Sequence, residues 1–344
     1  MTAATVVGMT SRSVAPQVLK LSTLVDIVSA IPYSLGFQPT DSIVAVALKG
    51  PRERLSFTMR VDLLPPEHDE DVARMCAERM AYANAESVLL FIYTSPPERL
   101  GDLPRHELVE HIQKALSVPL RDAVLVADGR AWSYLCAEPQ CCPPEGHVLT
   151  ANSPGAINVA AAHALAGDVL LPSRDALVAT TRPVGGVAAA SMLQAIDRAI
   201  DDVADIGVGD ELVDSSLEMV DRLCAGYADG PVTLTHDTAA QLALRAHHVV
   251  FRDAVLGRLA RGDDALARLV ADLARLAQPP YDAPAATMLG VCGYFRGDGV
   301  VGLSAAERAL ASDPDYSLAK LLVHAIENQM DPKHMRRIWA KHRR

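Results

Sequence analysis

The first 150 residues alternate short apolar runs with segments whose apolar residues recur every three or four positions. Residues 42–48 and 87–93 form almost wholly apolar runs, which are typical of strands in the middle of a sheet. Residues 55–63 alternate in part, as a half-buried strand does, and residues 69–83 have the spacing of an amphipathic helix. The order helix–strand–strand–helix–strand–helix–strand–strand predicts a mixed sheet with helices on at least one face.

The hydrophobic pattern changes near residue 150, where strand-like runs nearly vanish and helical spacings take over. We therefore predict an α+β protein in which a mixed α/β domain (21–150) precedes an all-helical domain (151–332). Residues 1–20 are small, polar and aperiodic, so we expect them to be disordered. Residues 333–344 are expected to form a basic C-terminal tail. The helical spacings fall at roughly 186–204, 211–227, 236–260, 264–276, 284–296, 302–312 and 317–328.

One part of the helical domain has a more specific pattern. Gly290 and Tyr294 fall in one expected helix, Ala305 and Ala309 fall in the next, and Pro314 follows. Small residues where helices cross, and a proline after the second helix, are typical of a tetratricopeptide-like helical hairpin. An ordinary hairpin within a helical bundle remains the alternative.

Composition and charge narrow the classes of function. The 344 residues carry 42 acidic against 32 basic side chains, a net charge of −10, which excludes a nucleic-acid surface spread over the whole body. The segment "KHMRRIWAKHRR" (333–344) is the exception, so nucleic acid is a possible partner only through this tail. No secretory signal and no membrane-spanning run is recognisable, and we expect a cytoplasmic protein with free thiols.

Charged residues cluster at expected strand ends, where ligand sites of α/β sheets gather. Asp41 precedes one strand, while Arg60 and Asp62 end the next and face the same side because they are two positions apart. A small-ligand site and a surface ion pair both fit this pattern, and the ion pair is favoured.

The segment "SYLCAEPQCCPPEGHVL" (133–149) contains Cys136, Cys141, Cys142 and His147, which are zinc-ligand types at the edge of normal ligand spacing. Neighbouring side chains of an extended backbone point in opposite directions, so one metal would use Cys136, one of the adjacent pair and His147. No Lys or Arg lies between Ala131 and Arg174 to stabilise a thiolate, which disfavours a redox centre. Ordered structural thiols are preferred to zinc, and zinc is preferred to redox chemistry. No other cofactor is expected.

Four co-linear segments together resemble a known family. They are "LSTLVDIVSAIPYSLGFQPTDSIVAVAL", "RVDLLP", "AVLVADGRAWSYLCAEPQCCPPEG" and "YFRGDGVVGLSAAERALASDPDYSLAKLL". The family that the chain resembles is actinobacterial and is catalogued as domain of unknown function number 4192. The likeness runs from about Leu21 to Met330, and the resemblance implies no activity and no catalytic residues to carry over.

Two functions remain open. The first is a cytoplasmic, non-enzymatic interaction or regulatory protein with a protein partner, because helical hairpins often bind peptides and no hydrolase motif is present. The second is an enzyme or small-ligand-binding protein whose site lies at the strand ends near Asp41, Arg60 and Asp62. Convergence of these three residues in a pocket would favour the second function.

Overall fold

The computed structural model describes residues 5–7, 23–99, 101–136, 138–150, 153–165, 169–207, 209–229 and 232–341. The chain divides into two compact units, Met1–Ala176 and Leu177–Arg344.

The first unit is built on a mixed sheet whose described strands follow the order β1-β3-β2-β4-β5-β6-β7. Strands β4 and β5 run parallel, and the other neighbouring pairs are antiparallel. The predicted α+β fold class is confirmed. Thr5–Val7 lie in the segment expected to be disordered but pair with the open edge of β3; the rest of residues 1–20 lies outside the described residues. The strands are β1 (Thr5–Val7), β2 (Ser42–Lys49), β3 (Arg54–Asp62), β4 (Ser87–Tyr93), β5 (Leu120–Ala127), β6 (Arg130–Ser133) and β7 (His147–Val148).

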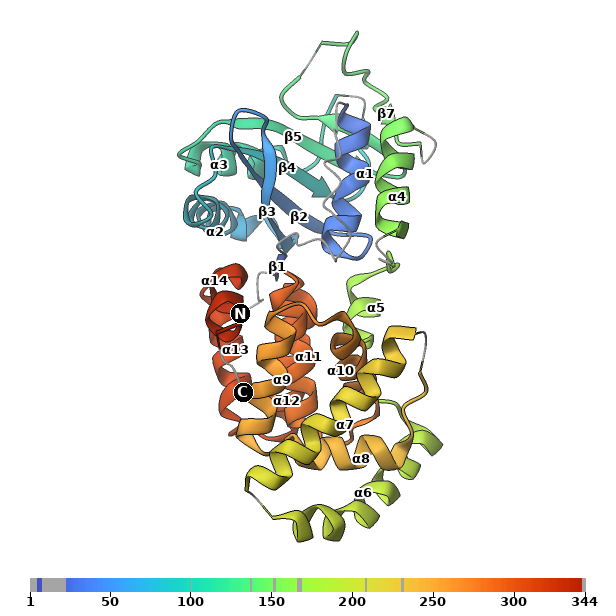
Figure 1. Ribbon diagram of the computed structural model, residues 1–344. Helices are drawn as coiled ribbons and strands as arrows, with labels where there is room; N and C mark the ends of the chain where they lie inside the picture. Colours follow the sequence, from blue (N-terminus) through green and yellow to red (C-terminus); the bar gives the residue numbers. More distant parts are fainter. Residues whose placement is uncertain are drawn as a thin grey trace. The chain divides into compact units, whose positions relative to one another are not determined.

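Helices lie on both faces of this sheet (Figure 1). Helices α2 (Asp69–Tyr82) and α3 (His106–Ala115) cover one face and share a buried core with β2, β3 and β4. Helices α1 (Leu24–Leu35) and α4 (Pro154–Leu165) lie on the other face (Figure 1). The sheet is therefore the middle layer of the unit.

Helix α1 contains Pro32 in its interior, continues to Leu35 and ends at Gly36, which has a φ of 80°. A proline inside a helix costs about 3 kcal/mol because it removes a backbone donor and crowds the preceding turn. Ile31 and Leu35 are both 1% exposed. Burial of such a side chain contributes about 1.5–3 kcal/mol, so the two together offset the cost.

Helix α4 packs against α1, although the sequence pattern groups it with the helical domain. A side chain on Gly155 would overlap the carboxylate of Asp26, so glycine allows this close approach. Asp26 also caps α1, because its carboxylate accepts a hydrogen bond from the Thr23 N–H while the Thr23 hydroxyl accepts one from the Asp26 N–H. Ala156 and Val159 of α4 are buried, which places this helix in the first unit.

The described part of the second unit is helical, as predicted, and has a core rich in alanine and leucine. The segment 236–260 forms two helices instead of one, with a turn at 246–248 that lets both Leu242 and Phe251 reach the core. No helix in the described part of the chain is long and apolar enough to cross a bilayer. The helices are α5 (Arg174–Ala179), which runs into this unit, α6 (Gly186–Ile206), α7 (Asp210–Asp229), α8 (His236–Arg245), α9 (Val249–Ala260), α10 (Asp264–Leu276), α11 (Ala283–Phe295), α12 (Gly299–Ser312), α13 (Ser317–Glu327) and α14 (Pro332–Trp339).

Helices α11 and α12 cross at glycines. A side chain on Gly290 would lie 3.0 Å from the carbonyl oxygen of Gly302 and 2.9 Å from the Leu322 side chain. The two backbones therefore approach as closely as a tetratricopeptide hairpin requires. Ordinary helical hairpins cross in the same way, so the tetratricopeptide-like interpretation stays a prediction.

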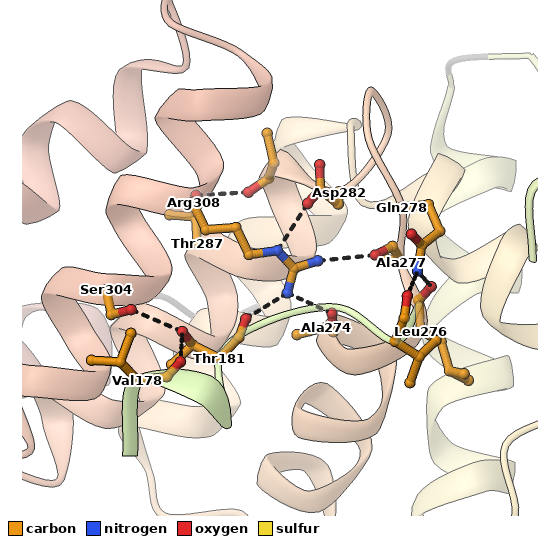
Figure 2. Close-up of polar contacts among 12 residues, drawn as sticks. Val178, Thr181, Ala274, Leu276, Ala277, Gln278, Asp282, Thr287, Ser304 and Arg308 are labelled. Carbon is orange, nitrogen blue, oxygen red and sulfur yellow. Dashed lines mark hydrogen bonds and ion pairs between the residues drawn. The ribbon is translucent and has the colours of Figure 1, made fainter. Parts of the chain in front are cut away.

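A buried arginine joins three segments of the second unit (Figure 2). Arg308 on α12 donates to the Asp282 carboxylate at 2.9 Å and to the carbonyl oxygens of Thr181, Ala274 and Ala277 at 2.8, 2.7 and 2.9 Å. The side chain of Arg308 is 11% exposed and that of Asp282 is 1% exposed. The guanidinium therefore donates the hydrogen bonds that carbonyls at the end of α10 and in the segment after α5 would otherwise receive from water.

The basic segment expected to be a free tail begins as helix α14 and packs on the second unit. Arg336 donates to the carbonyl oxygen of Ala260 at 2.7 Å, and Trp339 packs against the core. The prediction of a free tail is wrong for residues 333–341, because an apolar face at Met335 and Trp339 accompanies the charges. Residues 342–344 lie outside the described part of the chain.

Candidate ligand-binding site

A cavity of about 670 Å³ opens at the end of the sheet where the carboxyl ends of β4 and β5 lie. Thr94 and Ser95 follow β4, the Asp128–Gly129 turn follows β5, and both segments line the cavity. Because β2 is antiparallel to β4, the start of β2 lies at the same end of the sheet and brings the segment Gln38–Asp41 to the cavity. The carboxyl ends of parallel strands are where α/β sheets place their ligands.

Helices α1 and α4 form the apolar wall of this cavity. Val28 and Pro32 of α1 face Ala156 and Ala160 of α4 around it. Tyr33 also lines the cavity, and its ring stacks on His163 of α4 with centroids 4.7 Å apart and planes 17° apart. An apolar wall with a few polar groups at one end is the usual make-up of a small-molecule site.

A row of polar side chains crosses the sheet at the cavity end. Asp62 of β3 pairs with Ser42 of β2, and Ser42 pairs with Tyr93 of β4. Cross-strand partners share a face, and Ile92 belongs to the core on the α2 and α3 side, so this row lies on the α1 and α4 side. Tyr93 lines the cavity.

Two hydroxyls of this row are buried without a partner. The Tyr93 hydroxyl and the Ser42 Oγ are inaccessible and make no hydrogen bond with any described residue. Burial raises the pKa of Tyr93 above its usual range, so the phenol stays protonated and keeps a donor to offer. An unpartnered buried hydroxyl costs about 1–3 kcal/mol, and because buried polar groups are nearly always hydrogen-bonded, each such group calls for an explanation.

The structure places the three predicted strand-end residues next to one another, but only one of them lines the cavity. Arg60 forms an ion pair with Asp62 and donates to the carbonyl oxygen of Thr40 at 3.3 Å. Thr40 precedes Asp41, which lines the cavity and has a φ of 39°. The Arg60 hydrogen bond to Thr40 therefore holds the turn that carries Asp41. The sequence reasoning missed Tyr93, because a tyrosine that ends an apolar run looks like a core residue.

The charge of the cavity lining is negative. Asp41 and Asp128 contribute carboxylates, and none of the described lining residues is Lys or Arg. Asp128 has a φ of 45° and Gly129 one of 71°, as a tight Asp-Gly turn requires, so the turn fixes the backbone of this cavity-lining residue. Two carboxylates without a cation disfavour an anionic ligand.

The cysteine-rich segment forms a second cluster of functional groups in the first unit. The sulfur atoms of Cys136, Cys141 and Cys142 all lie within 4.8 Å of one another, and His147 is outside this group. The expectation that Cys141 and Cys142 point apart is wrong, because residues 139–141 form a turn in place of extended backbone. The N–H groups of both cysteines donate to the Glu138 carbonyl at 3.1 and 2.7 Å. His147 instead pairs with Ala131 in the β6–β7 ladder.

The cysteine loop is attached to β6 by polar contacts. The indole N–H of Trp132 donates to the Pro144 carbonyl at 3.0 Å, and Arg130 donates to the Glu145 carbonyl at 3.0 Å. Gly146 has a φ of 78° and lies flat against the Trp132 ring, where a side chain would overlap the indole. The loop therefore has a fixed return path.

Comparisons with known proteins identify a family but no activity. The searches of curated proteins and of solved structures returned no significant match. The family model for "Domain of unknown function (DUF4192)" matches residues 25–333, which is most of the chain. The protein therefore belongs to the DUF4192 family.

Proposed function

We propose that the first unit binds a small organic molecule in the cavity at the ends of β4 and β5. The observation that carries this proposal is Tyr93, which lines the cavity and whose buried hydroxyl has no partner among the described residues. Its burial costs free energy that a bound acceptor or donor would recover. The cavity volume of about 670 Å³ is in the range of small-molecule sites.

The lining selects a neutral or positively charged ligand. Asp41 and Asp128 attract a cation or accept hydrogen bonds from hydroxyl and amine groups. Tyr33 and Pro32 offer flat apolar surface to a ring. An amine with a hydrophobic or ring portion satisfies both parts of the cavity, whereas a phosphate or carboxylate would meet two like charges.

Ligand screening by nuclear magnetic resonance tests this proposal. Protein labelled with ¹⁵N is titrated with amines, sugars and nucleosides, and with phosphorylated and carboxylated counterparts as the comparison. We expect amines to shift the signals of Thr94, Ser95 and Gly129, and the anionic counterparts to leave them unchanged. Asp41→Asn and Asp128→Asn should each weaken binding of the amine, because each removes one attractive charge.

A matched control is Glu53→Gln, which removes an exposed carboxylate at the opposite end of the strands, beside Arg121. It should leave the affinity unchanged. Preferential binding of anions, or equal losses for Glu53→Gln and Asp41→Asn, would refute the assignment of charge. Shifts confined to other parts of the chain would refute the site.

We propose a second function for the helical unit, namely the binding of a protein partner. The close crossing of α11 and α12 at Gly290 and Gly302 supports it, because paired helices of this kind commonly present a groove to a peptide. Covalent cross-linking in native cells followed by mass spectrometry tests it. Cross-links from Lys320 on the adjoining α13 to one recurrent protein would support the proposal, and only random cross-links would count against it.

We also propose that the protein works in the cytoplasm. Cys136, Cys141 and Cys142 are free and accessible, and three such thiols persist only where the medium is reducing. Fractionation of native cells, with the thiols trapped by an alkylating reagent at lysis, tests this. Recovery of the protein with oxidised cysteines in an extracytoplasmic fraction would contradict it.

A further inference from the structure

We propose that Cys136, Cys141 and Cys142 form a three-thiolate zinc site that uses no histidine. This site is separate from the cavity described above, and its test does not depend on the ligand proposal.

The positions of the three sulfur atoms fit one metal ion. Zinc–sulfur bonds of about 2.3 Å in a tetrahedron place neighbouring sulfurs about 3.8 Å apart. The sulfurs of Cys141 and Cys142 are 3.6 Å apart, those of Cys136 and Cys141 are 2.9 Å apart, and all three lie within 4.8 Å of one another. Side-chain rotations that change the sulfur–sulfur distances by up to about 1 Å would therefore bring the three atoms to equal distances from one ion.

Backbone hydrogen bonds hold the loop in a conformation that brings the three thiols together. The N–H groups of Cys141 and Cys142 both donate to the Glu138 carbonyl, which turns both thiols to one side. The hydroxyl of Ser133 accepts from the N–H of Cys136 at 3.1 Å and fixes the other arm of the loop.

The charge near the three thiols is negative. Asp122 and Glu138 both place a carboxylate near the cluster. No Lys or Arg lies between Ala131 and Arg174 in the sequence. A divalent ion would therefore supply positive charge that this segment lacks.

Zinc binding is a ligand exchange with release of protons. Three thiols lose three protons as three zinc–sulfur bonds form and the ion gives up bound waters, and the fourth position keeps one water because the loop is exposed. The net charge of the filled site is −1. The affinity must therefore rise as the pH increases from about 6 to about 8, since fewer protons then compete for sulfur.

Metal titration of the full chain tests the site. Reduced, metal-free protein is titrated with Co²⁺, and zinc is then added to displace it. We expect one Co²⁺ per chain, sulfur-to-cobalt charge-transfer bands and the d–d bands of a four-coordinate ion, all abolished by one equivalent of zinc. Cys136→Ser, Cys141→Ser and Cys142→Ser should each lower the zinc affinity by more than about 100-fold, because even residues that only orient a ligand change affinity 10–100-fold.

His147→Ala is the matched control, since it removes the nearby zinc-ligand type that the structure leaves outside the cluster. It should leave both the cobalt spectrum and the zinc affinity unchanged. Ser133→Ala, which leaves every sulfur in place, should weaken zinc binding by about 10–100-fold without changing the number of sulfur-to-cobalt bands. Circular dichroism checks that each variant folds.

Three results would overturn the proposal. The first is no stoichiometric cobalt or zinc at any pH in this range. The second is loss of binding in His147→Ala equal to that in the cysteine variants. The third is a Cys136–Cys141 disulfide that persists in the cellular protein trapped at lysis, which would assign the 2.9 Å sulfur pair to redox chemistry.

Discussion

The Arg308→Ala variant should lower the free energy of unfolding of the helical unit by about 4 kcal/mol. The substitution leaves the Asp282 carboxylate, which is 1% exposed and has one oxygen without a partner among the described residues, as a buried unpaired charge. Loss of one partner of a buried pair costs about 3–5 kcal/mol. Three carbonyls, those of Thr181, Ala274 and Ala277, also lose a donor, although the space left by the side chain admits water to some of them.

Urea unfolding followed by tryptophan fluorescence measures this loss. The chain has two tryptophans, Trp132 in the first unit and Trp339 in the second, so a Trp132→Phe background leaves a reporter in the helical unit alone. Lys320→Ala is the control, because it breaks an exposed ion pair with Asp315 and should cost less than about 1 kcal/mol.

A double variant separates the unpaired charge from the lost carbonyl bonds. Adding Asp282→Asn to Arg308→Ala removes the buried charge and should restore about 1–2 kcal/mol of the loss. A loss below about 1 kcal/mol in Arg308→Ala, or no recovery in the double variant, would refute the reasoning.

Further predictions concern two packing contacts. Trp339→Ala should lower the free energy of unfolding of the helical unit by roughly 1–3 kcal/mol, because α14 packs through this half-buried ring. Urea unfolding followed by circular dichroism measures the loss, and an unchanged midpoint would show that the helix does not dock. Gly146→Ala should lower the free energy of unfolding by about 1–3 kcal/mol, because it strains a left-handed backbone and overlaps the Trp132 indole. It should also weaken zinc binding in the cobalt competition. Gly209→Ala, where open space surrounds the backbone, is its control and should stay within about 0.5 kcal/mol of the parent protein.

Much of the fold was predictable because the strongest hydrophobic patterns coincide with buried elements. The apolar runs at 42–48 and 87–93 are the central strands β2 and β4, and the shift to helical spacing marks the helical region. Strand β7 has two residues and gives no periodic signal. The extension of α1 past Pro32 depends on burial of Leu35 in the tertiary structure, which local propensity cannot report.

The candidate sites were predictable only in part. Asp41 was recognisable because a polar residue beside a buried strand is conspicuous. Tyr93 was not, since its proposed role rests on the lack of a hydrogen-bond partner, which is a property of packing and not of residue type. The cysteine spacing was visible, but the turn that brings Cys141 and Cys142 to one side requires the backbone hydrogen bonds of Glu138. His147, which spacing alone included, lies outside the cluster and pairs with Ala131 in the β6–β7 ladder.

The Tyr93→Phe variant, measured both with and without ligand, tests the ligand-binding claim most directly. Without ligand, removal of an unpartnered buried hydroxyl should leave the free energy of unfolding unchanged or raise it by about 1 kcal/mol. With the amine found by screening, the affinity in isothermal titration calorimetry should fall about tenfold, the equivalent of one hydrogen bond. Tyr82→Phe, on an exposed ring of α2, should change neither quantity. A Tyr93→Phe variant that loses more than about 1 kcal/mol of stability while its affinity is unchanged would contradict the account, because the hydroxyl would then serve the fold and not a ligand.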